Sequence, residues 1–352
     1  MKRIGISEIA RLAKVSIGTV DRALHGRKEI NEATRQRILA IAAQHGYRPN
    51  LAASVLSRGK PAITIGVCIP REVHFFYDQM REGFTSEAHR FAALGVEIVY
   101  RSFERLGVGE VEKMGELLSV KPQIAAICPG EPQQLAPLIG EAEKRNIRVI
   151  CVASDAPGSS RSTLICVDPV VNGQLAAELM GKFLPPKPDV AIITGSAATE
   201  DHRKKVQAFS EVFPNYSAMG RVLEVVEGHD EEDETFQKVF ALLDRYPNLQ
   251  GLYVSTANCL PVCHALGARG LHGKVKLITT DLFNEMVPYF EKGTILASIH
   301  QRPYVQGQIA VRLAVDYLAN GKALPAAYFL TPHIAMRSNL STFREIRRDG
   351  AS

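Results

Sequence analysis

The chain of 352 residues contains 46% hydrophobic and 22% charged residues. This composition is typical of a globular protein with two or three domains, and it excludes a disordered or fibrous chain. Charged residues occur among the first eight, and no run of about eighteen apolar residues follows, so we expect neither a signal peptide nor a membrane-spanning helix. The six cysteines form no CxxC pair and most lie in apolar runs. The sequence therefore predicts a reduced, cytoplasmic protein.

Positive charge is concentrated near the N-terminus. Residues 1–60 contain twelve Lys and Arg against four Asp and Glu, a net charge of +8, whereas the remaining 292 residues have a net charge of −3. A small basic module of this kind is typical of proteins that bind polyanions. A solvated basic tail would have a low-complexity sequence, but apolar residues recur here with the period of a helix.

Three helices are predicted in this module, at Glu8–Ala13, at Ile17–Leu24 and from residue 32 to about His45. Each follows a residue whose side-chain oxygen can cap a helix, namely Ser7, Ser16 and Asn31. Two short helices with a tight connection and a longer third helix indicate a helix-turn-helix unit over residues 1–48.

The sequence ISEIARLAKVSIGTVDRAL, followed by INEATRQRILAIAAQHGYRPNLAASVL, resembles the LacI/GalR family of bacterial transcription regulators. The resemblance implies that Ile17, Gly18 and Arg22 face base edges in the major groove of operator DNA. It further implies that polar and basic groups hold phosphates and that a following hinge contacts the minor groove. The remaining residues of the expected DNA-binding set are Ser7, Ser16, Thr19, Asn31, Thr34, Arg35, Asn50, Ala53 and Leu56.

The chemistry of the second helix agrees in part with this assignment. Arg22 can bind O6 and N7 of guanine, and Ile17 can contact a thymine methyl group, whereas Gly18 offers no side chain. Lys14 stands where the family usually has glycine, so a left-handed backbone there would be strained unless the lysine adds a phosphate contact. Asp21 replaces a frequent serine, and its carboxylate needs a partner such as Arg22 or a cytosine amine.

Residues 49–61 form the expected hinge and linker. The segment NLAASVLSR is compatible with a helix, but a helix shorter than about twelve residues is marginal alone in water. The resemblance implies that the hinge helices of two subunits pair in the minor groove and that Leu56 wedges between base steps. The alternative is a plain linker with an incidental leucine.

From residue 62 onward, short Val- and Ile-rich runs alternate with amphipathic stretches, which predicts parallel sheets covered by helices. There are too many strands for one sheet, so we expect an α/β domain of two Rossmann-like lobes. The segments DAPGSSR, VDPVVNGQLAAE and SIHQRPYVQG resemble the type I periplasmic-binding-protein fold that the family has as its sensor. We assign one lobe to residues 62–164 and 293–322, and the other to residues 165–292 and 323–340.

Ligands of such lobes bind beyond the carboxyl ends of the strands. The residues expected at these positions include two aromatic, amide, carboxylate and basic side chains, which suit a polyhydroxylated effector: Phe75, Phe76, Asp155, Arg203, Lys205, Asn258, Asp281 and Gln301. An acid frequent in the family is displaced from position 153 to Asp155, and the cluster HRKK is basic, which indicates an acidic or phosphorylated sugar. Asp155 and Asp281 have an alternative role as caps of loops.

No nucleotide-binding or hydrolase motif occurs, and Cys259, Cys263 and His264 lack further ligands for a metal site, so we expect neither an enzyme nor a cofactor. The sequence predicts a DNA-binding transcription regulator, by default a repressor, that forms a homodimer on a pseudo-palindromic operator and responds to a small carbohydrate-like effector. The alternative is a solute-binding receptor of a sugar transport system, which would account for the two lobes and not for the basic helical module.

Overall fold

The structure is a computed structural model that describes residues 6–24, 30–45 and 63–346. The headpiece consists of α1 (Ile6–Ala13), α2 (Ile17–Leu24) and α3 (Glu32–Gln44). Ile9, Val20 and Ile38, one from each helix, are fully buried in one apolar cluster. Oxygen atoms of Ser16 and Asn31 accept backbone N–H groups of Thr19 and Ala33, as the two predicted caps require. These contacts confirm the three predicted helices.

The predicted cap at Ser7 is wrong. The first helix begins at Ile6, so Ser7 lies within its first turn. The side chain of Ile6 packs against the apolar cluster of the headpiece, and this contact favours the earlier start of the helix.

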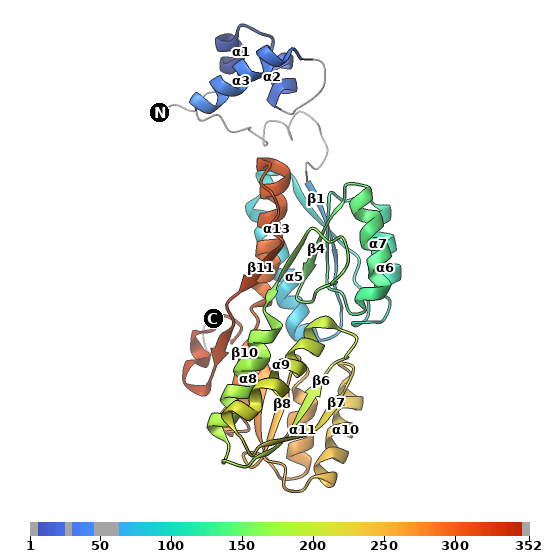
Figure 1. Ribbon diagram of the computed structural model, residues 1–352, viewed down its shortest axis with the longest axis vertical. Coiled ribbons are helices and arrows are strands. Elements are labelled where there is room, and N and C mark those ends of the chain that lie inside the picture. Colours follow the sequence, from blue (N-terminus) through green and yellow to red (C-terminus); the bar gives the residue numbers. More distant parts are fainter. Residues whose placement is uncertain (1–5, 25–29, 46–62, 347–352) are drawn as a thin grey trace, which may run out of the picture.

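The first lobe contains a sheet of six parallel strands in the order β11-β5-β4-β3-β1-β2. Apolar residues of α5 and α13 cover one face and those of α6 and α7 cover the other (Figure 1). The elements are β1 (Ile63–Cys68), α5 (His74–Arg90), η1 (Ala92–Leu94), β2 (Val96–Tyr100), α6 (Glu110–Ser119), β3 (Ile124–Ile127), α7 (Pro132–Lys144), β4 (Arg148–Val152), β5 (Thr163–Val167), α13 (Pro303–Asn320) and β11 (Ala327–Leu330).

The second lobe repeats this plan with the strand order β12-β10-β9-β8-β6-β7, in which only β12 is antiparallel to its neighbour. Helices α8 and α9 pack on one face, and α10, α11 and α12 on the other. The elements are α8 (Pro169–Phe183), β6 (Asp189–Thr194), α9 (Glu200–Tyr216), β7 (Arg221–Glu227), α10 (Glu232–Arg245), β8 (Gly251–Val254), α11 (Leu260–Ala268), β9 (Lys276–Thr280), η2 (Asn284–Met286), α12 (Val287–Glu291), β10 (Ile295–His300), β12 (His333–Ala335) and η3 (Arg337–Thr342).

The chain crosses between the lobes after β5, after β10 and after β11, and these crossings correct the expected lobe boundaries. Strand β10, assigned to the first lobe, pairs with β9 of the second. Strand β11, assigned to the second lobe, pairs with β5 of the first. The expected boundary at residue 164 would have divided β5 between the lobes, but this strand lies wholly in the first lobe. Buried parallel strands have similar apolar sequences in both sheets, so their pattern does not show which sheet they extend.

Within the described ranges, no helix combines the length and the apolar character needed to cross a lipid bilayer.

Candidate functional site

The exposed surface of α2 is formed by the residues expected to face DNA. Ile17 is 56% exposed, which is unusual for isoleucine and leaves its side chain free to meet a base edge. Arg22 lies one turn beyond Gly18, and its Nε donates a hydrogen bond to the Gly18 carbonyl oxygen at 3.2 Å. The hydroxyls of Ser16 and Thr19 lie 2.9 Å apart at the start of the same helix. The helix therefore presents its N-terminal half to an approaching surface.

The turn before α2 contains the strained backbone that the sequence suggested. Lys14 has a φ of 52°, in the left-handed region that costs a residue other than glycine about 1–2 kcal/mol. Its side chain is exposed beside the α2 N-terminus. The predicted hinge residues Asn50, Ala53 and Leu56 lie outside the described residues.

The two lobes meet along a cleft and contact each other across it. Phe75 of the first lobe stacks on Phe283 of the second, with ring centroids 4.1 Å apart. The Gln79 amide donates to the Leu282 carbonyl oxygen at 3.0 Å, and Arg105 lies 2.7 Å from Glu231. Two cavities that share Val73, Asp230 and Ala257 lie between the lobes; we call the one of about 40 Å³ the inner cavity and the one of about 380 Å³ the outer cavity. The inner cavity has room for water but not for a sugar, so the lobes are closed.

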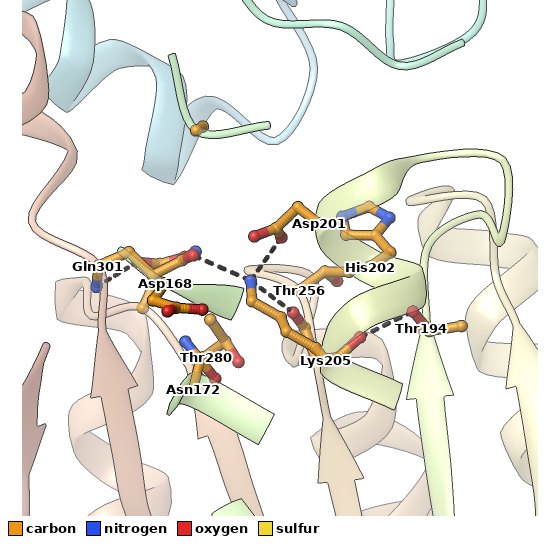
Figure 2. Close-up of polar contacts among 12 residues, drawn as sticks. Asp168, Asn172, Thr194, Asp201, His202, Lys205, Thr256, Thr280 and Gln301 are labelled. Carbon is orange, nitrogen blue, oxygen red and sulfur yellow. Dashed lines mark hydrogen bonds and ion pairs between the residues drawn. The ribbon is translucent and has the colours of Figure 1, made fainter. Parts of the chain in front are cut away.

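Lys205 of α9 is at the centre of the inner cavity and is only 1% exposed. Its ammonium group lies 2.6 Å from Asp201 Oδ2 and donates to Gln301 Oε1 at 2.9 Å (Figure 2). It also donates to the Ser255 carbonyl oxygen at 3.3 Å. A buried cation needs such partners because its desolvation is costly.

Asp281 and Gln301 form the second half of this network. Gln301 donates to the Asp281 carboxylate through its backbone N–H at 3.0 Å and through its amide at 2.8 Å. Asp281 has a φ of 69°, and strained backbone of this kind concentrates at ligand sites. The two residues follow β9 and β10, so the carboxyl ends of neighbouring strands bring them together.

The predicted effector residues do not all line the same cavity. Phe76, Lys205, Asp281 and Gln301 line the inner cavity, and Phe75 and Asn258 line the outer one. Phe75 and Phe76 are consecutive in α5 and therefore point in different directions, so the two rings cannot enclose one sugar ring between them.

Asp155 and Arg203 line neither cavity. Asp155 forms a bidentate ion pair with Arg161 and accepts a hydrogen bond from the Ala156 N–H. These contacts fit the alternative prediction that Asp155 caps a loop. Arg203 lies on the outer side of α9, where it pairs with Glu200 at 2.6 Å. Neither residue faces these two cavities in this structure, and their roles in effector binding stay predictions.

Comparisons with known proteins identify both parts of the chain. Residues 5–50 match the family model of bacterial regulatory proteins of the lacI family, and residues 65–323 match that of the periplasmic binding protein domain. Catabolite control protein A of Priestia megaterium is 24% identical over 333 residues, which are 94% of this chain and 97% of that protein. The chain belongs to the LacI family of bacterial regulatory proteins. It is a DNA-binding transcription regulator.

Further similarities concern single parts of this LacI-family chain. Catabolite control protein B of Bacillus subtilis is 38% identical over 89 residues, 25% of this chain and 28% of that protein. A solute-binding protein of Burkholderia graminis in complex with D-arabinose has a TM-score of 0.74 and 24% identity, and covers 80% of this chain and 97% of its own. One of Bacillus halodurans with bound myo-inositol has a TM-score of 0.72 and 15% identity, and covers 80% and 97%. These two structures show the shared fold.

The structure adds cavity residues that sequence reasoning missed in this LacI-family chain. Asp201 precedes Lys205 by one helical turn, and this i,i+4 spacing was a signal that could have identified the pair. Asp230 follows β7 at the carboxyl end of its sheet, where the strand-end rule applies equally. The other missed side chains of the inner cavity include Tyr77, Ser154, Thr199, His202 and Thr256.

Two carboxylates face the buried ring of His300. Its Nδ1 lies 3.7 Å from Asp281 Oδ1, and its Nε2 lies 3.5 Å from Glu345 Oε1. Burial alone would lower the pKa of His300, but the two carboxylates raise this pKa above its usual value. His300 therefore connects the inner cavity with the segment that follows η3.

The raised pKa of His300 predicts that the effector-free regulator loses stability as the pH rises. A group whose pKa is higher in the folded than in the unfolded chain stabilises the fold fully below the unfolded pKa, about 6.5 for histidine, and this contribution is lost as the pH rises through the folded pKa. We expect the free energy of unfolding, measured by urea titration, to fall above pH 6.5. The variant His300→Gln should lack this part of the decline; the same decline in wild type and variant would refute the assignment.

The described residues contain no group of three His, Cys, Asp or Glu side chains that could hold a metal ion. Cys259 and Cys263 are both fully buried, and a hydrogen bond between them together with burial raises the pKa of Cys259 well above its usual value. These thiols lie within the apolar cluster of the second lobe and contribute to its packing.

Proposed function

We propose that this regulator is a repressor that binds a pseudo-palindromic operator as a homodimer, and that a small sugar or polyol between its lobes controls operator affinity. The observation that carries the proposal is the buried network of Lys205, Asp281 and Gln301 inside a closed cleft, on the same chain as a helix-turn-helix headpiece. A transport receptor would need the cleft and not the headpiece. The proposed place of action is the cytoplasm, where operator DNA is found.

The proposed effector binds where the described cavity residues offer paired donors and acceptors. Sugar hydroxyls both donate and accept, which suits the amide of Gln301 and the carboxylate of Asp281, and the ring of Phe76 offers an apolar surface. The closed cleft must open to admit such a molecule. The effector changes operator affinity only through its different affinities for the two arrangements of the lobes.

Two arginines of the headpiece should differ in their effect on operator binding. Arg22→Ala should cost about 1–3 kcal/mol and relax the preference at one guanine of each half-site, because its guanidinium is proposed to read that base. Arg35→Ala on α3 should weaken binding to all sequences alike and reduce the salt dependence, because it is proposed to hold a phosphate. Selection of binding sites from random DNA with each variant separates the two roles. An unchanged base preference for Arg22→Ala would remove this residue from the readout.

Support for the homodimer comes from apolar side chains at the lobe crossings. Tyr328 and Phe329 on β11 are 43% and 54% exposed, although both are large and apolar. Strand β11 pairs with β5, so Val170 and Val171, which follow β5 and are also exposed, lie near the end of β11. Tyr328 and Phe329 are neighbours in a strand, so they point to opposite faces of the sheet and come together only at its exposed edge. We call the four residues around this edge the crossover patch. Such a patch is typical of an interface, and a two-fold axis would place it against its own copy.

A ligand screen tests the proposed effector site directly. The full chain is heated with single monosaccharides and polyols, and a molecule that binds the folded protein raises its melting temperature by mass action. At a hundred times its dissociation constant, a ligand adds about 2.7 kcal/mol, or a few degrees for a domain of this size. The identified sugar should then change the affinity for the selected operator. A sugar that binds without changing operator affinity would contradict the proposed control.

A further inference from the structure

The carboxylates of the inner cavity can be matched with positive groups one by one. Asp201 is paired with Lys205 at 2.6 Å. Asp281 has His300 3.7 Å behind it. The third carboxylate, Asp230, has no positive partner among the described residues, and its Oδ1 is buried without a hydrogen bond. Asp230 is thus the carboxylate of the inner cavity that has no ion pair among the described residues.

Asp230 lies where the two cavities adjoin, so a ligand that enters the cleft would contact its side chain. Its side chain lines both the inner and the outer cavity. The loop that presents it has two consecutive left-handed residues, His229 with φ 51° and Asp230 with φ 57°. Left-handed backbone at residues other than glycine concentrates where a loop positions a group for a ligand.

No lysine or arginine in the described lining of the cleft is free to pair with an anion. Seven carboxylates line the two cavities, against Lys205 and Arg105 as the only lysine and arginine among the lining residues. Lys205 is paired with Asp201, and Arg105 lies 2.7 Å from Glu231. The carboxylates are those of Glu72, Asp201, Asp230, Glu231, Glu232, Asp233 and Asp281.

His202 also lines the inner cavity. Its Nδ1 accepts the Ser196 N–H at 3.1 Å, so this nitrogen is not available to donate to an anion. The sequence-based expectation of an acidic or phosphorylated sugar is therefore at odds with the cleft. The basic side chains of Arg203 and Lys204, on which it rested, are both paired with Glu200.

Two further acceptors in the cavity lack donors. Asp201 is paired through Oδ2, but its Oδ1 is buried without a partner, and its side chain is only 9% exposed. The Ser154 hydroxyl oxygen, from the opposite lobe, is likewise buried and unpartnered. A buried polar atom without a partner is costly, so a ligand rich in donors that enters when the lobes open would stabilise the cleft by pairing with these atoms.

We propose that the effector is a sugar or polyol that carries an ammonium group, and that this group binds the carboxylate of Asp230 while hydroxyls of the same molecule donate to Asp201 Oδ1 and Ser154. This inference rests on the proposed function, since it specifies the chemistry of the effector in the same cleft. The ammonium supplies the charge that Asp230 lacks, and charge-assisted hydrogen bonds of this kind are the strong ones. A phosphate or carboxylate on the ligand would face the acidic lining of the outer cavity.

Matched sugar derivatives test the inference by calorimetry with the full chain. The compounds are glucose, galactose and mannose, each as the parent, the 2-amino, the 2-acetamido and the 6-phosphate derivative. We expect one amino sugar to bind at least about tenfold more tightly than its parent and its acetamido derivative, because acetylation removes the charge. Asp230→Asn, which tolerates a left-handed backbone, should remove this preference. Asp244→Asn, outside the cleft and paired with Arg269, is the matched control and should keep it.

The outcomes separate this inference from the proposed function. A parent sugar or a phosphate that binds as tightly as the amino sugar overturns the ammonium assignment and leaves the sugar-responsive regulator intact. An amino-sugar preference that persists in Asp230→Asn overturns the role of Asp230. Binding of none of the compounds overturns both this inference and the proposed sugar effector.

Discussion

Asp281→Asn should shift the effector response to much higher effector concentrations and leave operator binding in the absence of effector unchanged. Asparagine keeps the size of the side chain and tolerates the left-handed backbone at this position. Its amide can accept only one of the two hydrogen bonds that Gln301 donates, so Gln301 and the Lys205 ammonium that it contacts lose their fixed positions. A charge-assisted hydrogen bond contributes about 1.5–3 kcal/mol. We expect effector affinity, measured by calorimetry, to fall roughly tenfold to hundredfold.

The matched control for this change is Asp155→Asn. Asp155 also follows a strand, but it pairs with Arg161 outside both cavities, so this variant should bind effector as the wild type does. Operator affinity in the absence of effector is measured for both variants by fluorescence anisotropy. If Asp281→Asn fails to bind operator without effector, Asp281 supports the fold of the regulator and is not specific to ligand binding.

Phe329→Asp should convert the proposed homodimer into a monomer that has lost operator affinity. The side chain is 54% exposed in the single chain, so a carboxylate there does not disturb the core. At a two-fold interface each substitution acts twice, and each copy would lose about 1.5–3 kcal/mol of apolar burial and place one charge against another. We expect monomers in sedimentation experiments at micromolar concentration. Operator affinity should fall by at least about a hundredfold, because one headpiece contacts only one half-site.

Val225→Asp is the control for the crossover patch. Val225 is also an exposed apolar strand residue, 43% exposed, but it lies on β7 at the far edge of the second sheet. This variant should sediment and bind operator like the wild type. A Phe329→Asp chain that remains dimeric would move the interface to another face of the molecule.

The sequence predicts the local structure of this chain better than its topology. The headpiece helices follow from capping residues and apolar spacing, which act within a few residues of each other. The strand Thr163–Val167 was missed because only ten residues separate it from Val152, too few for the helix expected between parallel strands. The exchange of β10 and β11 between lobes depends on contacts between residues far apart in sequence, which a single strand pattern does not contain.

The sequence predicted those site residues whose place depends on the ends of strands. It missed residues whose role depends on the presence or absence of a partner side chain. Strand ends placed Asp281 and Gln301 correctly, because neighbouring parallel strands deliver their ends to one edge. The same rule predicted Asp155 in the site, but in the structure the Asp155 carboxylate pairs with Arg161 outside both cavities. Asp230 was missed because its importance comes from the absence of a positive partner, which only the packed structure shows.

The most direct test of the account is operator affinity as a function of effector concentration, measured for the wild-type regulator and Asp281→Asn. The operator is the sequence selected from random DNA, and the effector is the compound that raises the melting temperature in the ligand screen. The account predicts that the wild-type affinity changes with effector until the cleft is saturated, whereas the variant needs roughly tenfold to hundredfold more effector for the same change. Equal effector dependence in both chains would contradict control of DNA binding by this cleft.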